Sequence, residues 1–245
     1  MFFFKRKEII VDCFTPHYDI YESYRPLPAN NFIPEGWKSL PKTINMKALQ
    51  RSNMEIPRGT MKMCKGFTNL FSSGFIIQLW SDVALDSNTD PMSQIAASNS
   101  IFFNSHPDYQ MWDGLYRGYK HVKFSSPWAL VEKTGVKFTW NRCDWHNTDI
   151  ADKMHMVSAV TDFKYQHHAN MNIFIKDNSI VKLTAGQPMV HLIPMSEHKL
   201  KLKYHLISLQ EFDTRFYHST KFSGEYKENV RLIDNKSKCP FGFGK

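Results

Sequence analysis

Long apolar runs are missing from this sequence. The longest, residues 75–80, is interrupted by Gln78 and is far shorter than the roughly 18 apolar residues that indicate a membrane span. Residues 1–7 place Phe side chains before basic ones, whereas a secretory signal has the opposite order and a longer apolar stretch. We therefore expect neither membrane insertion nor export.

Cysteine is scarce and shows no pairing pattern. The residues Cys13, Cys64, Cys143 and Cys239 lie far apart, and no C-x-x-C pair occurs. This spacing argues against a zinc knuckle and against a dense disulfide framework. Reduced, partly buried thiols fit a cytoplasmic protein, in its own cell or in an infected host cell, and a virion is a further location for a viral protein.

Catalytic and metal-binding signatures are also missing. The chain has no P-loop, no dinucleotide-binding fingerprint, no nucleophile elbow and no H-E-x-x-H motif. His155 and His167 are the candidate ligands for zinc or iron, because a strand would bring them close and a nearby carboxylate would complete the set. Solvated or hydrogen-bonded histidines are the preferred interpretation, so no metal site is predicted. A nucleophilic pair of Cys143 and His146 is left open.

The sequence does contain enough apolar and aromatic material for one core. Hydrophobic residues make up 42% and aromatic residues 14% of the 245 residues, which fits a single globular domain over residues 1–245. The formal charge of +8 favours anionic partners such as nucleotides, and nucleic acid is not excluded. Because the basic residues are mostly scattered, a solvated surface is the alternative interpretation of that charge.

Short strands separated by turn residues predict a mainly β core. Strands are expected at residues 8–14, 75–80, 93–103, 122–124, 128–131, 136–140, 171–175, 180–183 and 189–193. Ser-Ser-Pro, Lys-Thr-Gly, Lys-Asp-Asn and Gly-Gln-Pro segments separate the later ones, and such spacing is typical of a sandwich or barrel. A helix is expected at residues 65–71, ended by Gly74 in a left-handed conformation.

The two ends of the chain differ from the β core at residues 61–198. Residues 1–60 are rich in proline, which fixes φ and removes an amide donor, so this region is expected to wrap the surface, with Ile33 and Trp37 as anchors. The extension at residues 199–245 contains apolar residues near helical spacing, which predict a helix at 206–217. An extended Phe/Gly tail is expected to follow that helix.

Residues 159–193 resemble the central segment of dUTPases. Residues 159–166 read Ala-Val-Thr-Asp-Phe-Lys-Tyr-Gln, and residues 186–193 read Gly-Gln-Pro-Met-Val-His-Leu-Ile. The dUTPase family has G-[VIL]-I-D-x-D-Y-x-G, a strand, a turn, a strand and G-x-[RP]-[IV]-A-Q-[LM]-[IV] in this order. Residues 123–128, Lys-Phe-Ser-Ser-Pro-Trp, resemble a segment of an uncharacterised family of tailed-bacteriophage proteins. The resemblance implies a dUTPase-like β-clip fold in a phage-type protein.

The resemblance also implies roles for the matching residues. Asp162 corresponds to the carboxylate that polarises the attacking water. Tyr165 would pack its ring beneath a deoxyribose, and Gln166 belongs to the same substrate-binding segment. Arg142 stands near the place of the family's P-R-S segment and would approach the phosphates as a rigid cation.

The Phe/Gly tail and the assembly complete the implied site. Phe241 or Phe243 would stack on the base, while the glycines beside them let backbone amides approach phosphate oxygens. A bound nucleotide would bring Mg²⁺ as cofactor, and dUTPase sites form between the subunits of a trimer, which implies a homo-oligomer. Ala159, Lys164 and Cys143 depart from the family pattern, so the resemblance leaves open whether hydrolysis follows.

Three functions are therefore expectations of the sequence. The favoured one is binding of a nucleotide or another phosphorylated small molecule in a dUTPase-like site. The alternative is a non-enzymatic virion or protein-interaction component that uses the same fold for packing. A metal-dependent enzyme with histidine ligands is the second alternative.

Overall fold

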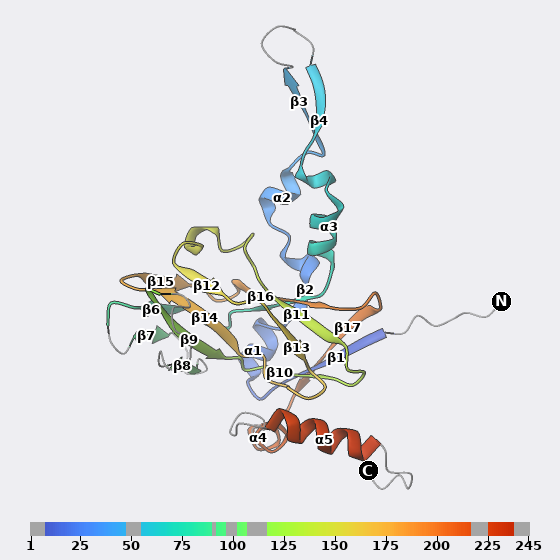
Figure 1. Cartoon of the computed structure of the whole chain (residues 1–245), viewed down its shortest axis with the longest axis vertical. Coiled ribbons are helices and arrows are strands. Elements are labelled where there is room, and N and C mark those ends of the chain that lie inside the picture. Colours follow the sequence, from blue (N-terminus) through green and yellow to red (C-terminus); the bar gives the residue numbers. More distant parts are fainter. Residues whose placement is uncertain are drawn as a thin grey trace, which may run out of the picture.

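The fold is that of a computed structural model, which describes residues 8–47, 55–89, 92–96, 102–106, 117–216 and 225–237 (Figure 1). Its strands are β1 (Glu8–Thr15), β2 (Leu27–Pro28), β3 (Thr43–Lys47), β4 (Glu55–Gly59), β5 (Phe75–Gln78), β6 (Val83–Asp86), β7 (Ser93–Ala96), β8 (Phe102–His106), β9 (Tyr119–Ser125), β10 (Ala129–Glu132), β11 (Lys137–Arg142), β12 (Met154–Met156), β13 (Ala159–Asp162), β14 (Met171–Lys176), β15 (Ile180–Leu183), β16 (Pro188–Pro194) and β17 (Lys199–Leu206). Its helices are α1 (Tyr18–Ser23), α2 (Glu35–Ser39), α3 (Lys65–Ser72), α4 (Leu209–Phe216) and α5 (Glu225–Ser237), with short 3₁₀ turns η1 (Ala29–Phe32), η2 (Met61–Met63) and η4 (Thr148–Ile150).

The body of the molecule consists of four small β-sheets. Their strand orders are β10-β1-β17, β13-β11-β16-β5-β2, β12-β14-β9-β8 and β15-β6-β7. Every pairing is antiparallel except that of β1 with β17. The prediction of a mainly β fold is confirmed, while no sheet closes into a barrel within the described part of the chain.

The predicted strands agree with those observed, apart from one that is divided. The expected segments at 8–14, 75–80, 122–124, 128–131, 136–140, 171–175, 180–183 and 189–193 coincide with β1, β5, β9, β10, β11, β14, β15 and β16. The expected strand at 93–103 contains two strands, β7 and β8, and residues 97–101 between them lie outside the described residues.

One continuous apolar core lies between the sheets. In β1 the side chains of Ile9, Val11 and Cys13 are buried and alternate with more exposed residues, as the two-residue period of a strand requires. In β5 all four side chains are buried, because Phe75 and Ile77 pack into the main core on one face of the sheet while Ile76 packs with Ala29 and Cys143 on the other. The largest fully buried side chains of the core are Trp128, Phe75, Phe124, Phe138 and Phe163.

Gly74 connects α3 to β5 at a point of close packing. Its φ is 74°, so the predicted left-handed conformation is confirmed. A Cβ atom at this position would lie 2.0 Å from the backbone oxygen of Leu192 in β16. Only glycine therefore permits both the backbone angle and the approach of the two chain segments.

Residues 35–47 and 55–72 form an arm that projects from the body, with α2 and α3 at its base and the β3–β4 hairpin beyond them (Figure 1). The hairpin pairs from Thr43 opposite Gly59 to Lys47 opposite Glu55. The elements are short, as the prolines indicate, but the expectation that this region wraps the core is wrong for the hairpin. Pro57 is tolerated within β4 because both strands of a two-stranded ribbon are edge strands.

The C-terminal region corrects two further expectations. Residues Lys199–Leu206 form β17, in which Leu200 and Leu202 are half-buried while the lysines are exposed, and this strand pairs with the whole length of β1. The predicted helix at 206–217 is confirmed by α4. The segment expected to be an extended tail contains α5, which lies across the side of the body opposite the arm (Figure 1). None of the described helices has the length and apolar character needed to cross a lipid bilayer.

Candidate functional site

Asp162 and Arg142 lie at opposite ends of β11. Asp162 ends β13 and stands opposite Lys137, the first residue of β11, whereas Arg142 is the last residue of that strand. Five residues of antiparallel strand, at about 3.4 Å each, separate the two positions by about 17 Å. The structure therefore does not bring the proposed general base and the proposed phosphate ligand together in one chain.

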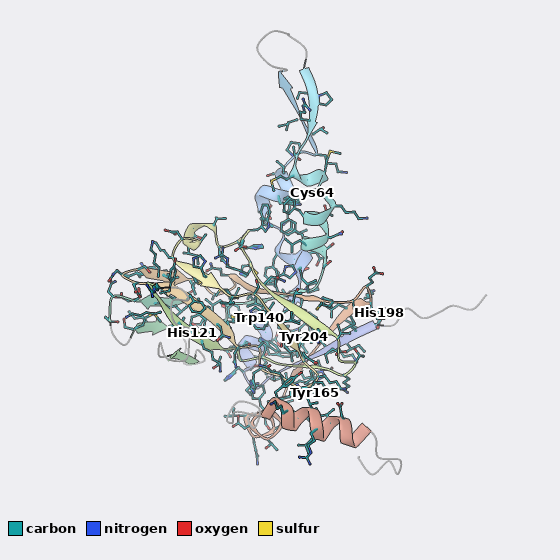
Figure 2. All side chains as sticks on the ribbon, in the orientation of Figure 1. Cys64, His121, Trp140, Tyr165, His198 and Tyr204 are labelled. Carbon is teal, nitrogen blue, oxygen red and sulfur yellow. The ribbon has the colours of Figure 1, made fainter. Side chains whose placement is uncertain are left out.

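The turn after β13 holds α5. The Asp162 carboxylate accepts a hydrogen bond from the backbone N–H of Lys164 (2.8 Å), which fixes the turn. The Tyr165 hydroxyl donates to the Asp234 carboxylate in α5 (2.8 Å), and the Lys164 ammonium lies 3.3 Å from the same oxygen. The Tyr165 ring meets Tyr226 edge-on, at 5.9 Å between ring centroids. Figure 2 shows Tyr165 beside α5. Tyr165 thus packs against α5.

Arg142 is engaged by its own neighbourhood. Its guanidinium pairs with Asp144 and donates to the Met154 carbonyl (3.0 Å) and to Nδ1 of His155 (3.1 Å). Since a guanidinium has only donors, His155 Nδ1 is the acceptor, and its Nε2 carries the proton that faces the Tyr119 hydroxyl at 3.3 Å. His155 is therefore bonded through both ring nitrogens.

The two candidate metal ligands occupy separate surroundings. His167 donates through Nδ1 to the Leu130 and Phe163 carbonyls (3.2 and 3.1 Å), and burial lowers its pKa, so that the ring is neutral at pH 7. His155 lies in the network of Arg142. Among the described residues no group of three or more His, Cys, Asp or Glu side chains has the arrangement of a metal site.

Cys143 and His146 are not arranged as a nucleophile and its base. Cys143 is buried, and desolvation together with nearby Asp144 raises the pKa of its thiol far above the usual range. The thiol is therefore protonated at neutral pH, and the His146 ring donates through Nε2 to the Phe32 carbonyl. Phe241 and Phe243, the proposed stacking residues, lie outside the described residues.

A cleft of about 240 Å³ runs along the outer side of β13. Its lining residues are Trp140 from β11, Val157, the strand residues Ala159, Val160 and Thr161, the loop residues Gln166, His168 and Asn170, and Asn172 from β14. Of the predicted site residues that the structure describes, only Gln166 lines this cleft. Asp162 and Tyr165 adjoin it in sequence but are not among its lining residues.

The base of the arm is held by an aromatic cluster, defined as Trp37, Phe67, Phe71 and Trp145. Trp37 comes from α2, the two phenylalanines come from α3, and Trp145 belongs to the loop after β11. The Trp145 ring lies 5.3 to 5.8 Å from the other three ring centroids in edge-on geometry. Trp37 thus ties the arm to the loop after β11.

Two histidines hold the points where the chain enters and leaves the arm. His146 donates to the carbonyl of Phe32, before α2, and His191 donates through Nε2 to the carbonyl of Ser73, after α3 (2.7 Å). Burial lowers the pKa of His191, and the positive potential of nearby His146 lowers it further. The arm is thus rigidly based, while its hairpin extends away from these contacts.

The arm also concentrates the positive charge of the chain. Residues 35–65 contain seven Lys and Arg and two Asp and Glu, which gives a net charge of +5 out of +8 for the whole sequence. One of the two acidic residues, Glu35, pairs with Lys38 at 2.6 Å. Sequence reasoning treated the basic residues as scattered, because only the fold shows that these belong to one projection.

No protein-family model matches this chain, and no curated protein is significantly similar to it in sequence.

Proposed function

We propose that the protein is a non-enzymatic interaction component that binds the acidic surface of a partner protein through its arm. Such a component fits a multi-protein assembly, of which a virion is one example. The observation that carries the proposal is the exposure of the β3–β4 hairpin, against which no other described element packs extensively.

An isolated hairpin is marginally stable in water, because two strands cannot bury an apolar face by themselves. In β3 and β4 every residue whose burial is described is exposed: Thr43, Ile44, Asn45, Pro57, Arg58 and Gly59. Both edges of such a ribbon also present backbone donors and acceptors that another chain can pair with. A partner that covers the hairpin would satisfy these groups, which is how strand addition contributes to binding.

The chemistry of the arm favours an acidic protein over nucleic acid. Positive charge alone serves both partners. Ile44, Met61 and Met63 are between 43% and 62% exposed and add apolar contact area, which protein interfaces use. The described hairpin strands have no aromatic side chain to stack on a base, since the aromatic residues of the arm belong to its base.

Nucleotide binding receives less support from the geometry. Arg142 is paired with Asp144 far from Asp162, and Tyr165 packs against α5. The described residues that line the cleft beside β13 include no Lys or Arg, and burial lowers the pKa of His168, so a phosphate there would have no counter-charge. The expected homo-oligomer enters the test below as one of its outcomes.

The test removes the hairpin. The Thr60 N–H donates to the Lys42 carbonyl (2.9 Å), so these two residues already lie close together. Residues 43–59 can therefore be replaced by a Gly-Gly linker. Binding of a fluorescent glutamate-rich peptide and of a DNA duplex is measured by anisotropy at low and high salt. We expect peptide binding that falls with salt and is lost in the deletion variant, while the melting temperature of the body is unchanged.

A charge-matched pair of variants locates the effect. Lys42→Glu with Arg58→Glu changes the arm, and Lys182→Glu with Lys201→Glu changes exposed strands of the body by the same charge. Only the first pair should weaken peptide binding. Equal loss in both pairs, or tighter binding of the duplex than of the peptide, would reject the proposal. Light scattering on the same samples identifies a second copy of the chain as the partner if the deletion variant alone is monomeric.

A further inference from the structure

The cleft beside β13 is formed where an edge strand of one sheet meets the first residues of another. β13 is the outer strand of its five-stranded sheet, and Ala159 stands opposite Trp140. Asn172 is the second residue of β14 in the neighbouring sheet. The loop between β13 and β14 supplies Gln166, His168 and Asn170. Rigid strands thus hold two walls of the cleft, and one ordered loop holds the third.

The described lining of the cleft carries no full charge. It contains no Lys, Arg, Asp or Glu, although the protein as a whole has a formal charge of +8. Burial lowers the pKa of His168, and the nearby His167 and Lys123 lower it further. The His168 Nε2–H donates to the Phe216 carbonyl (2.6 Å), so its Nδ1 is a neutral acceptor. An ionic ligand would be desolvated here without a partner of opposite charge.

The polar side chains of the cleft have unused hydrogen-bonding capacity. Thr161, Gln166, Asn170 and Asn172 make no side-chain hydrogen bond within the described part of the chain. Each carboxamide offers two donors and one acceptor, and the threonine hydroxyl both donates and accepts. These donors and acceptors are complementary to the hydroxyl groups of a ligand, because each hydroxyl oxygen both donates and accepts a hydrogen bond.

An apolar surface lies next to these polar groups. Val157 and Val160 are 39% and 58% exposed at the rim, whereas Trp140 is only 6% exposed and belongs to the apolar core behind the cleft. Such a surface takes up the C–H face of a ring, and the carboxamides then reach the substituents at its edge. The volume of about 240 Å³ is below the roughly 300–1,000 Å³ of pockets for drug-sized ligands, which limits the occupant to about one ring.

We infer that this cleft is a binding site for an uncharged saccharide unit, whose hydroxyl groups bond to Gln166, Asn170 and Asn172 while its apolar face rests against Val157 and Val160. The inference is independent of the arm, because the cleft and the arm share no residue. It assigns the loop of residues 163–170 a second task beside the support of α5.

The full chain is screened by saturation-transfer NMR against glucose, galactose, mannose and N-acetylglucosamine, with inorganic phosphate and deoxyuridine monophosphate as anionic probes. We expect at least one neutral sugar to bind, and calorimetry then gives its affinity. Asn170→Ala should weaken that affinity about threefold to tenfold, the effect of losing one hydrogen bond. Asn69→Ala, which removes an exposed carboxamide on α3 far from the cleft lining, should leave it unchanged.

Val160→Glu provides a second variant that does not depend on core packing, because the side chain is mostly exposed. A carboxylate at the rim should reduce sugar binding without changing the melting temperature. The inference fails if none of the sugars binds, if both variants bind as the original chain does, or if deoxyuridine monophosphate competes with the sugar and binds more tightly. The last result would instead support the hypothesis that the cleft binds a nucleotide.

Discussion

Gly74 and Gly118 have nearly the same backbone angle in different surroundings. Their φ values are 74° and 77°, but a Cβ on Gly74 would meet the Leu192 backbone at 2.0 Å, whereas a Cβ on Gly118 would meet nothing within 4 Å. Gly118→Ala therefore lowers the free energy of unfolding only by the cost of the left-handed backbone conformation, about 1–2 kcal/mol. Gly74→Ala adds a clash with backbone that cannot rotate away.

We expect Gly74→Ala to lower the free energy of unfolding by at least about 2 kcal/mol more than Gly118→Ala does. Urea denaturation of both variants measures the difference. Equal losses would contradict the close packing of α3's end on β16.

Glu132 is a buried carboxylate with a structural task. It is 1% exposed at the end of β10, and its oxygens accept hydrogen bonds from the N–H groups of Thr134 (2.8 Å), Gly135 (2.7 Å) and Val136 (3.0 Å) and from the Thr134 hydroxyl. By accepting hydrogen bonds from three successive backbone N–H groups, the Glu132 carboxylate stabilises the turn between β10 and β11.

Glu132→Gln should destabilise the protein by about 2–4 kcal/mol, because the new amide nitrogen would face donors and leave at least one of them buried without a partner. Thermal unfolding with Glu197→Gln, an exposed residue, as the control checks this expectation. A loss below about 1 kcal/mol would mean that the turn finds other acceptors.

At the scale of elements, helices and strands were predicted correctly where a short segment of sequence shows the spacing of its apolar residues. Strands such as β5, β14 and β16 were predicted from short apolar runs between turn residues, and α4 from its spacing of Leu209, Phe212 and Phe216. Two elements with an equally clear pattern were missed. The alternation in Lys199–Leu206 has the two-residue period of a strand, and Tyr226, Val230 and Ile233 in α5 have helical spacing.

The candidate site was predictable only in part. The segment at 159–166 does form a strand and a turn, and Gln166 lines the cleft. The positions of Asp162 and Arg142 depend on the register of β13 against β11, which no local pattern specifies. Trp140, Asn170 and Asn172 were missed as site residues, because they come together only through the meeting of two sheets.

Trp145→Ala tests the attachment of the arm. The indole contacts Trp37, Phe67 and Phe71, and its removal should loosen α2 and α3 while the core of the body stays intact. Hydrogen exchange should therefore accelerate at least about tenfold in residues 65–72 and remain slow in β5 and β16. Tyr18→Ala, which removes a 67% exposed ring from α1, is the control. Unchanged protection in α3 would show that the two histidine contacts suffice.

At the scale of the whole molecule, the stability depends on pH through buried histidines. Burial lowers the pKa of His167, His168 and His191, so each is neutral in the folded protein at a pH where the unfolded chain already takes up a proton. The unfolded state then binds more protons, and stability falls as pH drops below about 6.5.

We expect the free energy of unfolding to decrease from pH 7.5 to pH 5.5, by up to about 1.4 kcal/mol per pH unit for each of these histidines. Urea titrations at several pH values measure the slope. His191→Gln keeps a donor for the Ser73 carbonyl but removes one titrating group, so its slope should be shallower. A stability that is constant or rises over this interval would contradict the neutral state of the rings.

The parallel ladder between β1 and β17 has a consequence for synthesis of the protein. Residues 8–15 are translated long before their partner strand at residues 199–206. The central three-stranded sheet therefore cannot close during early elongation, and this contact of large sequence separation slows folding. Until β17 is available, β1 exposes one hydrogen-bonding edge, so we expect a chain truncated before residue 199 to aggregate more readily than the full chain.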